Sequence, residues 1–68
     1  MNKFIVHVPF NQEIVINTLL TYELNLMKSD NMRLFFITNQ DITCEHIETI
    51  ISKIKEMKLV YYYVEKDF

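Results

Sequence analysis

The chain has 68 residues, enough for a single domain over residues 1–68 with a thin hydrophobic core. A net charge of −2 gives no general attraction to nucleic-acid phosphates, and a composition that is 50% hydrophobic argues against disorder. A single cysteine excludes an internal disulfide, and no apolar run approaches the roughly 20 residues of a membrane helix. These features predict a cytoplasmic location with no membrane partner.

The N-terminal part of the chain predicts a strand followed by a helix. Residues 3–8 are β-branched and aromatic, as a strand requires. Asn11 is expected to cap a helix that runs to about Lys28, with Phe10 and Val15 as a hydrophobic staple. Polar residues recur every three or four positions in this stretch, which is typical of an amphipathic helix.

A rival interpretation concerns the second half of that helix. Residues 20–26 alternate between apolar and polar, as a half-buried strand would, and Leu24 lies on the wrong side of the helical pattern. A turn at 28–31 would join such a strand to the next one as a hairpin. Leu, Glu and Met favour a helix, and no residue of 22–27 is β-branched, so the composition narrowly favours the helix.

The C-terminal half predicts a strand, a helix and a last strand. Residues 32–38 are apolar on both faces, which indicates a central strand. Thr43 is expected to cap the second helix, with Ile42 and Ile47 as its staple. Its core stripe consists of Ile47, Ile50, Ile51, Ile54 and Met57. The last strand is expected at 59–64, followed by a short tail.

The order β-α-β-α-β predicts an α/β two-layer sandwich, with a three-stranded sheet and two helices on one face. If residues 20–26 form a strand, the order becomes β-α-β-β-α-β, a ferredoxin-like split unit. The strands are apolar on both faces, and the chain is too short to cover both. We therefore expect a homodimer that covers the open sheet face or continues the sheet at an edge.

The tyrosines of the last strand are candidates for that dimer or partner interface. Alternation places Tyr61 and Tyr63 on one face and Tyr62 on the other. With Phe35 they form the expected interface, in which a tyrosine hydroxyl stays at a wet rim. The same aromatic residues could instead stack on single-stranded nucleic acid, which is the alternative function.

No catalytic, cofactor-binding or metal-ligating residue is expected. Cys44 lies at the start of a predicted helix, where a thiol pKa is lowered, and His46 is nearby, but no third group orients them. His7, Cys44 and His46 lack the paired spacing of a zinc site. The protein is therefore expected not to be an enzyme.

Acidic residues outnumber basic ones and could face a basic partner protein. The candidates for this partner-facing surface are Glu13, Glu23, Asp30, Glu45 and Glu48.

The chain contains no Gly or Ala and is rich in Ile, Asn and Lys, which indicates an AT-rich coding source. In size, acidity and AT-rich coding character, the chain resembles small host-takeover proteins of phages that infect low-GC Gram-positive bacteria. Residues 31–35 (NMRLF) are similar to the Gln-x-x-Leu-Phe peptides that bind the DNA sliding clamp, with Asn in place of Gln. The resemblance implies a non-enzymatic inhibitor of a host DNA replication protein such as the clamp, acting in the host cytoplasm.

Overall fold

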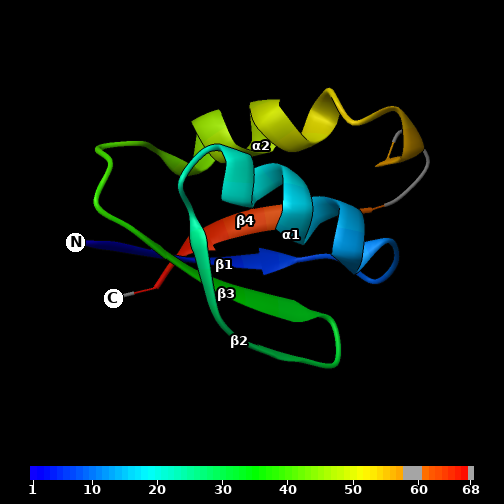
Figure 1. Ribbon diagram of the computed structural model, residues 1–68. Coiled ribbons are helices and arrows are strands. Elements are labelled where there is room, and N and C mark those ends of the chain that lie inside the picture. The colour runs from blue at the N-terminus through cyan, green and yellow to red at the C-terminus, as the bar shows by residue number, and fades with distance from the viewer. Residues whose placement is uncertain (58–60, 68) are drawn as a thin grey trace.

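The computed structural model describes residues 1–57 and 61–67 as a two-layer α/β domain. In chain order its elements are β1 (Asn2–His7), α1 (Gln12–Thr21), β2 (Asn25–Asp30), β3 (Arg33–Thr38), α2 (Cys44–Ser52), the 3-10 helix η1 (Lys55–Met57) and β4 (Tyr63–Lys66). The strands form one antiparallel sheet in the order β2-β3-β1-β4. Both helices lie on the same side of the sheet (Figure 1).

The α/β class and the single helical layer are confirmed, but the sheet of three strands is wrong, because it has four. The order is β-α-β-β-α-β, as in the alternative interpretation. In the sheet, β3 lies between β1 and β2, and β1 lies between β3 and β4, so each βαβ unit is split by one strand of the other. The extra strand is β2, in a region where composition had favoured a helix. The preference for helix over 22–28 is therefore wrong, and the rival strand begins later than expected.

Helix α1 ends at Thr21 through a Schellman motif. Glu23 adopts the left-handed conformation (φ 66°), and its N–H donates to the carbonyl of Leu20 at 3.0 Å. The N–H of Leu24 donates to the carbonyl of Leu19, also at 3.0 Å, and both leucine side chains are fully buried. Leu24 departs from the helical pattern because it belongs to the cap, where its side chain returns to the core.

The start of α1 also differs from the expected cap. Asn11 is left-handed (φ 58°) and its side chain caps no helical N–H, and Phe10 is 67% exposed. Asn11 is thus the N-cap residue, as predicted, but it caps the helix without a side-chain hydrogen bond, and the exposed Phe10 does not act as a staple. The Gln12 side-chain amide instead donates to the carbonyls of Val8 and Asn31, both at 3.0 Å. These bonds tie the helix start to the sheet.

The second helix follows the sequence pattern closely. The Thr43 hydroxyl accepts a hydrogen bond from the N–H of His46 at 3.2 Å, which confirms the cap. Ile42 packs against the core cluster to which the fully buried Ile47 belongs. The helix ends at Ser52, before the last two residues of the predicted core stripe. Ile54 follows the helix and Met57 lies in η1, and all five stripe residues are buried.

The last strand lies later than expected, at Tyr63–Lys66. Residues 59 and 60 of the predicted strand lie outside the described residues. The predicted alternation of faces is confirmed for residues 61–64. Tyr61 and Tyr63 are exposed, Val64 is buried, and Tyr62 packs against the core.

Candidate interaction surface

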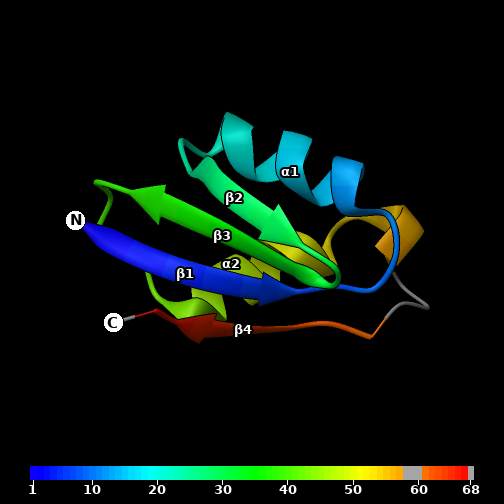
Figure 2. The same ribbon diagram turned by 90° about the horizontal axis from the view of Figure 1, so that it is seen from below.

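The sheet has one face packed on the helices and one open face. Core residues alternate along the strands and include Phe4, Val6, Leu34, Phe36 and Val64. Their neighbours point away from the helices, and no described helix or strand covers them; Figure 2 looks onto this side. We call this surface the open face and define it as Lys3, Ile5, His7, Lys28, Asp30, Arg33, Phe35, Ile37, Tyr63 and Glu65.

The registers arrange these residues in rows across the strands. The middle row, from β4 to β2, reads Glu65, Ile5, Phe35 and Lys28. The row beside it reads Tyr63, His7, Arg33 and Asp30. The middle row thus has an apolar centre with an acid at one end and a base at the other.

Phe35 lies at the centre of the open face and is only 8% exposed, although it is not part of the core between sheet and helices. The Lys28 ammonium lies 4.7 Å from the centre of its ring, and the Arg33 guanidinium carbon lies 5.3 Å away. Both distances are within the range of cation–π attraction. The charged groups of Lys28 and Arg33 therefore lie over this ring and shield it, and an incoming ligand would have to displace them to stack on it.

A second aromatic group lies at one end of the open face. His7 and Tyr63 stack with ring centroids 4.1 Å apart and planes 7° from parallel. Nε2 of His7 lies 2.6 Å from Oε2 of Glu65, which fixes the imidazole from its edge. The Tyr61 ring is tilted by 60° against Tyr63, with centroids 6.3 Å apart. The ring faces that His7 and Tyr63 turn toward each other are therefore occupied, and the exposed part of this group consists of Tyr61 and Tyr63.

These tyrosines border a cavity of about 170 Å³, which we call the aromatic pocket. It lies where β1, β4 and the β2–β3 turn meet, and is lined by His7, Val8, Pro9, Met32, Tyr61 and Tyr63. Tyr61 is 75% exposed, Met32 51% and Tyr63 40%. Large apolar side chains that are exposed to solvent thus gather around one cavity.

The charged groups of the open face are largely paired with each other. Arg33 donates two hydrogen bonds to the Asp30 carboxylate, from Nη2 at 2.6 Å and from Nε at 3.1 Å. The hydrogen bond from Arg33 lowers the pKa of Asp30, and the same bond raises the pKa of Arg33. Asp30 therefore lies on the open face beside a cation, apart from the other residues of the predicted acidic surface.

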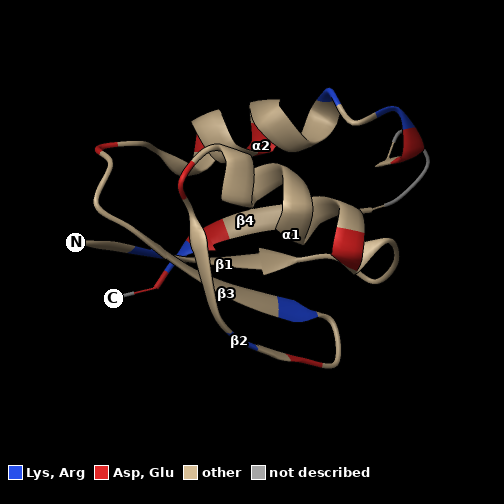
Figure 3. Cartoon of the chain, in the orientation of Figure 1, with Lys and Arg blue, Asp and Glu red and all other residues tan. Residues whose placement is uncertain are grey.

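The other acids lie on the two helices and, for Glu23, in the turn that follows α1. Glu13 and Glu45 are exposed on α1 and α2. Figure 3 shows acidic residues of both helices in red. Oε1 of Glu48 accepts a hydrogen bond from the N–H of Val64 at 3.3 Å, and its carbonyl accepts one from the Tyr62 hydroxyl at 3.4 Å. Glu48 and Tyr62 thus join α2 to β4.

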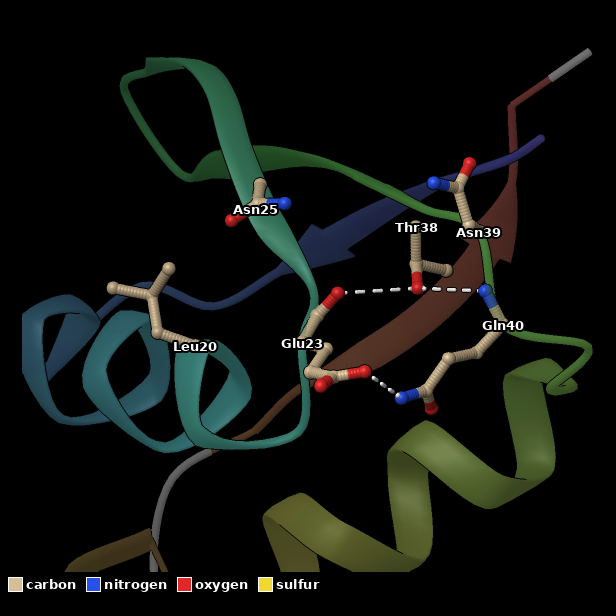
Figure 4. Close-up of a pocket in the computed structure, with 6 residues that line it drawn as sticks. All are labelled: Leu20, Glu23, Asn25, Thr38, Asn39 and Gln40. Carbon is tan, nitrogen blue, oxygen red and sulfur yellow. Dashed lines mark hydrogen bonds between the residues drawn. The ribbon is translucent and has the colours of Figure 1, made fainter.

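A larger polar cavity of about 370 Å³ lies at the other end of the fold, beyond α1 (Figure 4). Thr38 is buried, and its hydroxyl donates to the Glu23 carbonyl at 3.2 Å and accepts from the N–H of Gln40 at 3.1 Å. The Gln40 amide donates to the Glu23 carboxylate at 2.8 Å. Thr38, Glu23 and Gln40 are thus hydrogen-bonded to one another, and these bonds hold the left-handed turn at Glu23 in place.

Cys44 and the histidines belong to no metal-binding group in the part of the chain that the structure describes. No group of three His, Cys, Asp or Glu side chains suited to a metal occurs among those residues. Burial raises the pKa of Cys44, and the negative charge of Glu48 adds to this effect. The thiol pKa of Cys44 is therefore raised rather than lowered, with desolvation as the largest cause.

A raised pKa makes Cys44 a slow nucleophile. We expect iodoacetamide to alkylate it more slowly than free cysteine at pH 8, and the rate to rise when urea unfolds the chain. The measurement is the alkylation rate by mass spectrometry across pH. A folded-state rate above that of free cysteine would contradict the raised pKa.

No protein-family model, no curated protein and no solved structure matches this chain. Among the described helices, none has the length and apolar character needed to cross a bilayer.

Proposed function

We propose that this chain is a non-enzymatic protein-binding module that seats one apolar side chain of another protein in the aromatic pocket. The observation that carries the proposal is the exposure of Tyr61, Tyr63 and Met32 around a single apolar cavity. Tyr and Met are enriched in protein interfaces, where a few such residues supply most of the binding energy.

The size of the pocket supports a side chain rather than a small molecule. Its volume of about 170 Å³ is roughly half of the lower limit of common small-molecule pockets, which is about 300 Å³. A single apolar side chain of a partner fits a cavity of this scale.

Single-stranded nucleic acid is less well supported. Stacking on Phe35 would have to displace Lys28 and Arg33, and the His7 ring is already stacked on Tyr63. Arg33 also directs its guanidinium to Asp30, which weakens the field that a phosphate would feel. Phe35 and His7 thus have ring faces that are already occupied, while Tyr61 and Tyr63 stay exposed at the pocket.

The resemblance to phage proteins would make the partner a protein of the infected bacterium. The Leu-Phe pair of the clamp-like stretch at 31–35 does not supply the contact, because Leu34 is fully buried and Phe35 is shielded. If the partner is a replication protein such as the sliding clamp, we propose that it is bound through the aromatic pocket and inhibited by occupation of its surface.

The test compares two methionines of the same hairpin. Met32 lines the pocket, and Met27 lies in the bulge of β2, yet both are 51% exposed. Wild type, Met32→Asp and Met27→Asp are each immobilised and exposed to a lysate of a low-GC Gram-positive bacterium. We expect a protein that wild type and Met27→Asp retain and that Met32→Asp loses, because a buried carboxylate is unfavourable in the pocket.

A titration with that purified protein should then show at least about tenfold weaker binding for Met32→Asp and for Tyr61→Ala. Equal retention by all three chains would remove the pocket from the proposal. Salt-sensitive binding of a labelled single-stranded oligonucleotide, with no protein retained, would favour the nucleic-acid function instead.

A further inference from the structure

Both edges of the sheet are protected against a further strand. At β4 the outward N–H of Val64 already donates to Glu48 of α2. At β2 a register shift between Leu26 and Lys28 bulges the strand at Met27, which interrupts the ladder. A second copy that continued the sheet would meet one of these obstacles, so an additional chain is expected on the open face.

The middle row of the open face is complementary to itself. It places Glu65 at one end, Lys28 at the other, and Ile5 beside Phe35 between them. If a second copy is turned about a two-fold axis that runs parallel to the strands between β1 and β3, Glu65 faces Lys28 of the second copy. Ile5 then faces the Phe35 ring, which is uncovered when Lys28 turns from it to Glu65 of the second copy and Arg33 moves aside. Each contact occurs twice, as a two-fold interface requires.

We propose that the open face is a homodimer interface, in which two copies pair Lys28 with Glu65 around a centre of Ile5 and Phe35. A two-fold axis that lies in the interface and runs across the strands, along the middle row, would instead bring Lys28 against Lys28 and Glu65 against Glu65. Like charges placed in contact are unfavourable, so the charges select the parallel axis. This axis leaves the two aromatic pockets at the same end of the dimer.

The available area makes the proposed interface a small one. The molecule measures 31 × 23 × 18 Å, and two faces of 31 by 23 Å bury on the order of 1,400 Å², at the lower end of the range for specific interfaces. Because its apolar centre consists of Ile5 and Phe35, we expect dissociation in the micromolar range.

The experiment uses two charge reversals that each prevent self-pairing but allow pairing with the other. Lys28→Glu sets two carboxylates against each other at both contacts of the dimer, and Glu65→Lys sets two ammonium groups against each other there. Each variant alone is therefore expected to associate at least about tenfold more weakly than wild type. In an equimolar mixture, both contacts between unlike variants again join opposite charges. Sedimentation equilibrium and native mass spectrometry should show a heterodimer with near wild-type affinity.

Glu45→Lys on α2 is the matched control and should dimerise like wild type, because it reverses an exposed acid outside the interface. Circular dichroism checks the fold of every variant. If a reversal fails to fold, Lys28→Gln and Glu65→Gln remove the same charges and should each weaken association several-fold.

Recovery in the mixture supports the proposal, since unfolded chains could not restore each other. A wild type that stays monomeric throughout the micromolar range, reversals that dimerise like wild type, or a mixture without heterodimer would overturn it. Loss of partner capture by Met32→Asp is measured separately, so either proposal can fail alone.

Discussion

Replacing Phe36 with alanine is expected to leave the protein largely unfolded. Phe36 is fully buried between the sheet and the helices, and a Phe→Ala change at such a site costs about 3–5 kcal/mol. A domain of 68 residues has a free energy of unfolding of about 3–10 kcal/mol. The loss is therefore comparable with the whole stability, and urea denaturation followed by circular dichroism measures it.

Phe35→Ala is the matched control for Phe36→Ala. Phe35 is the adjacent residue, but its ring lies on the open face beneath Lys28 and Arg33, which can close over the space left behind. We expect a smaller cost of about 1–2 kcal/mol and a folded chain. A larger loss for Phe35→Ala than for Phe36→Ala would mean that the two faces of the sheet are assigned in reverse.

Thr38→Val is expected to lower the free energy of unfolding by about 1–3 kcal/mol. The substitution keeps the shape of the side chain, but it removes the hydroxyl that joins the Glu23 carbonyl to the N–H of Gln40. These two groups then lose a partner beside a buried position, and a buried polar group without a partner is unfavourable. The measurement is again the urea midpoint and slope.

Thr38→Ser separates the hydroxyl from the methyl group. It keeps both hydrogen bonds, so its loss should be clearly smaller than that of Thr38→Val. Equal losses in both variants would show that packing, rather than the hydroxyl, holds the left-handed turn at Glu23.

Helix α2 could be predicted well because its signals are local. The Thr43 cap follows from one hydroxyl at the helix start, and the isoleucine stripe follows from the helical period of hydrophobicity. Helix α1 could not be bounded in the same way. Its end is marked by a left-handed residue, which is usually glycine, and a chain without glycine places Glu23 there.

Two signals did point to the end of α1. Leu24 departed from the helical stripe, and residues 20–26 alternated as a strand would. The bulge at Met27 then shifts the register within β2, so the alternation could not give the correct strand boundaries. Local composition favoured the helix, and the strand exists because β3 pairs with it and because the Schellman motif turns the chain.

The candidate surface could be predicted only in part. Alternation placed Tyr61 and Tyr63 on one face, and the two-sided strands indicated an open face. The stacking of His7 on Tyr63 and the cations over Phe35 depend on which strands are neighbours, which the sequence does not show. Met32 was missed as a pocket residue because it lies in the β2–β3 turn, and the expected helix concealed that hairpin.

The most direct test of the open face as the interaction surface is a dilution series of the labelled protein, followed by amide chemical shifts. The account predicts that concentration-dependent shifts gather on β1, β3, Lys28 and Glu65, while the exposed positions of α1 and α2, such as Glu13 and Glu45, stay constant. Shifts that gather on the helical layer, or along the outer edge of β2, would contradict it.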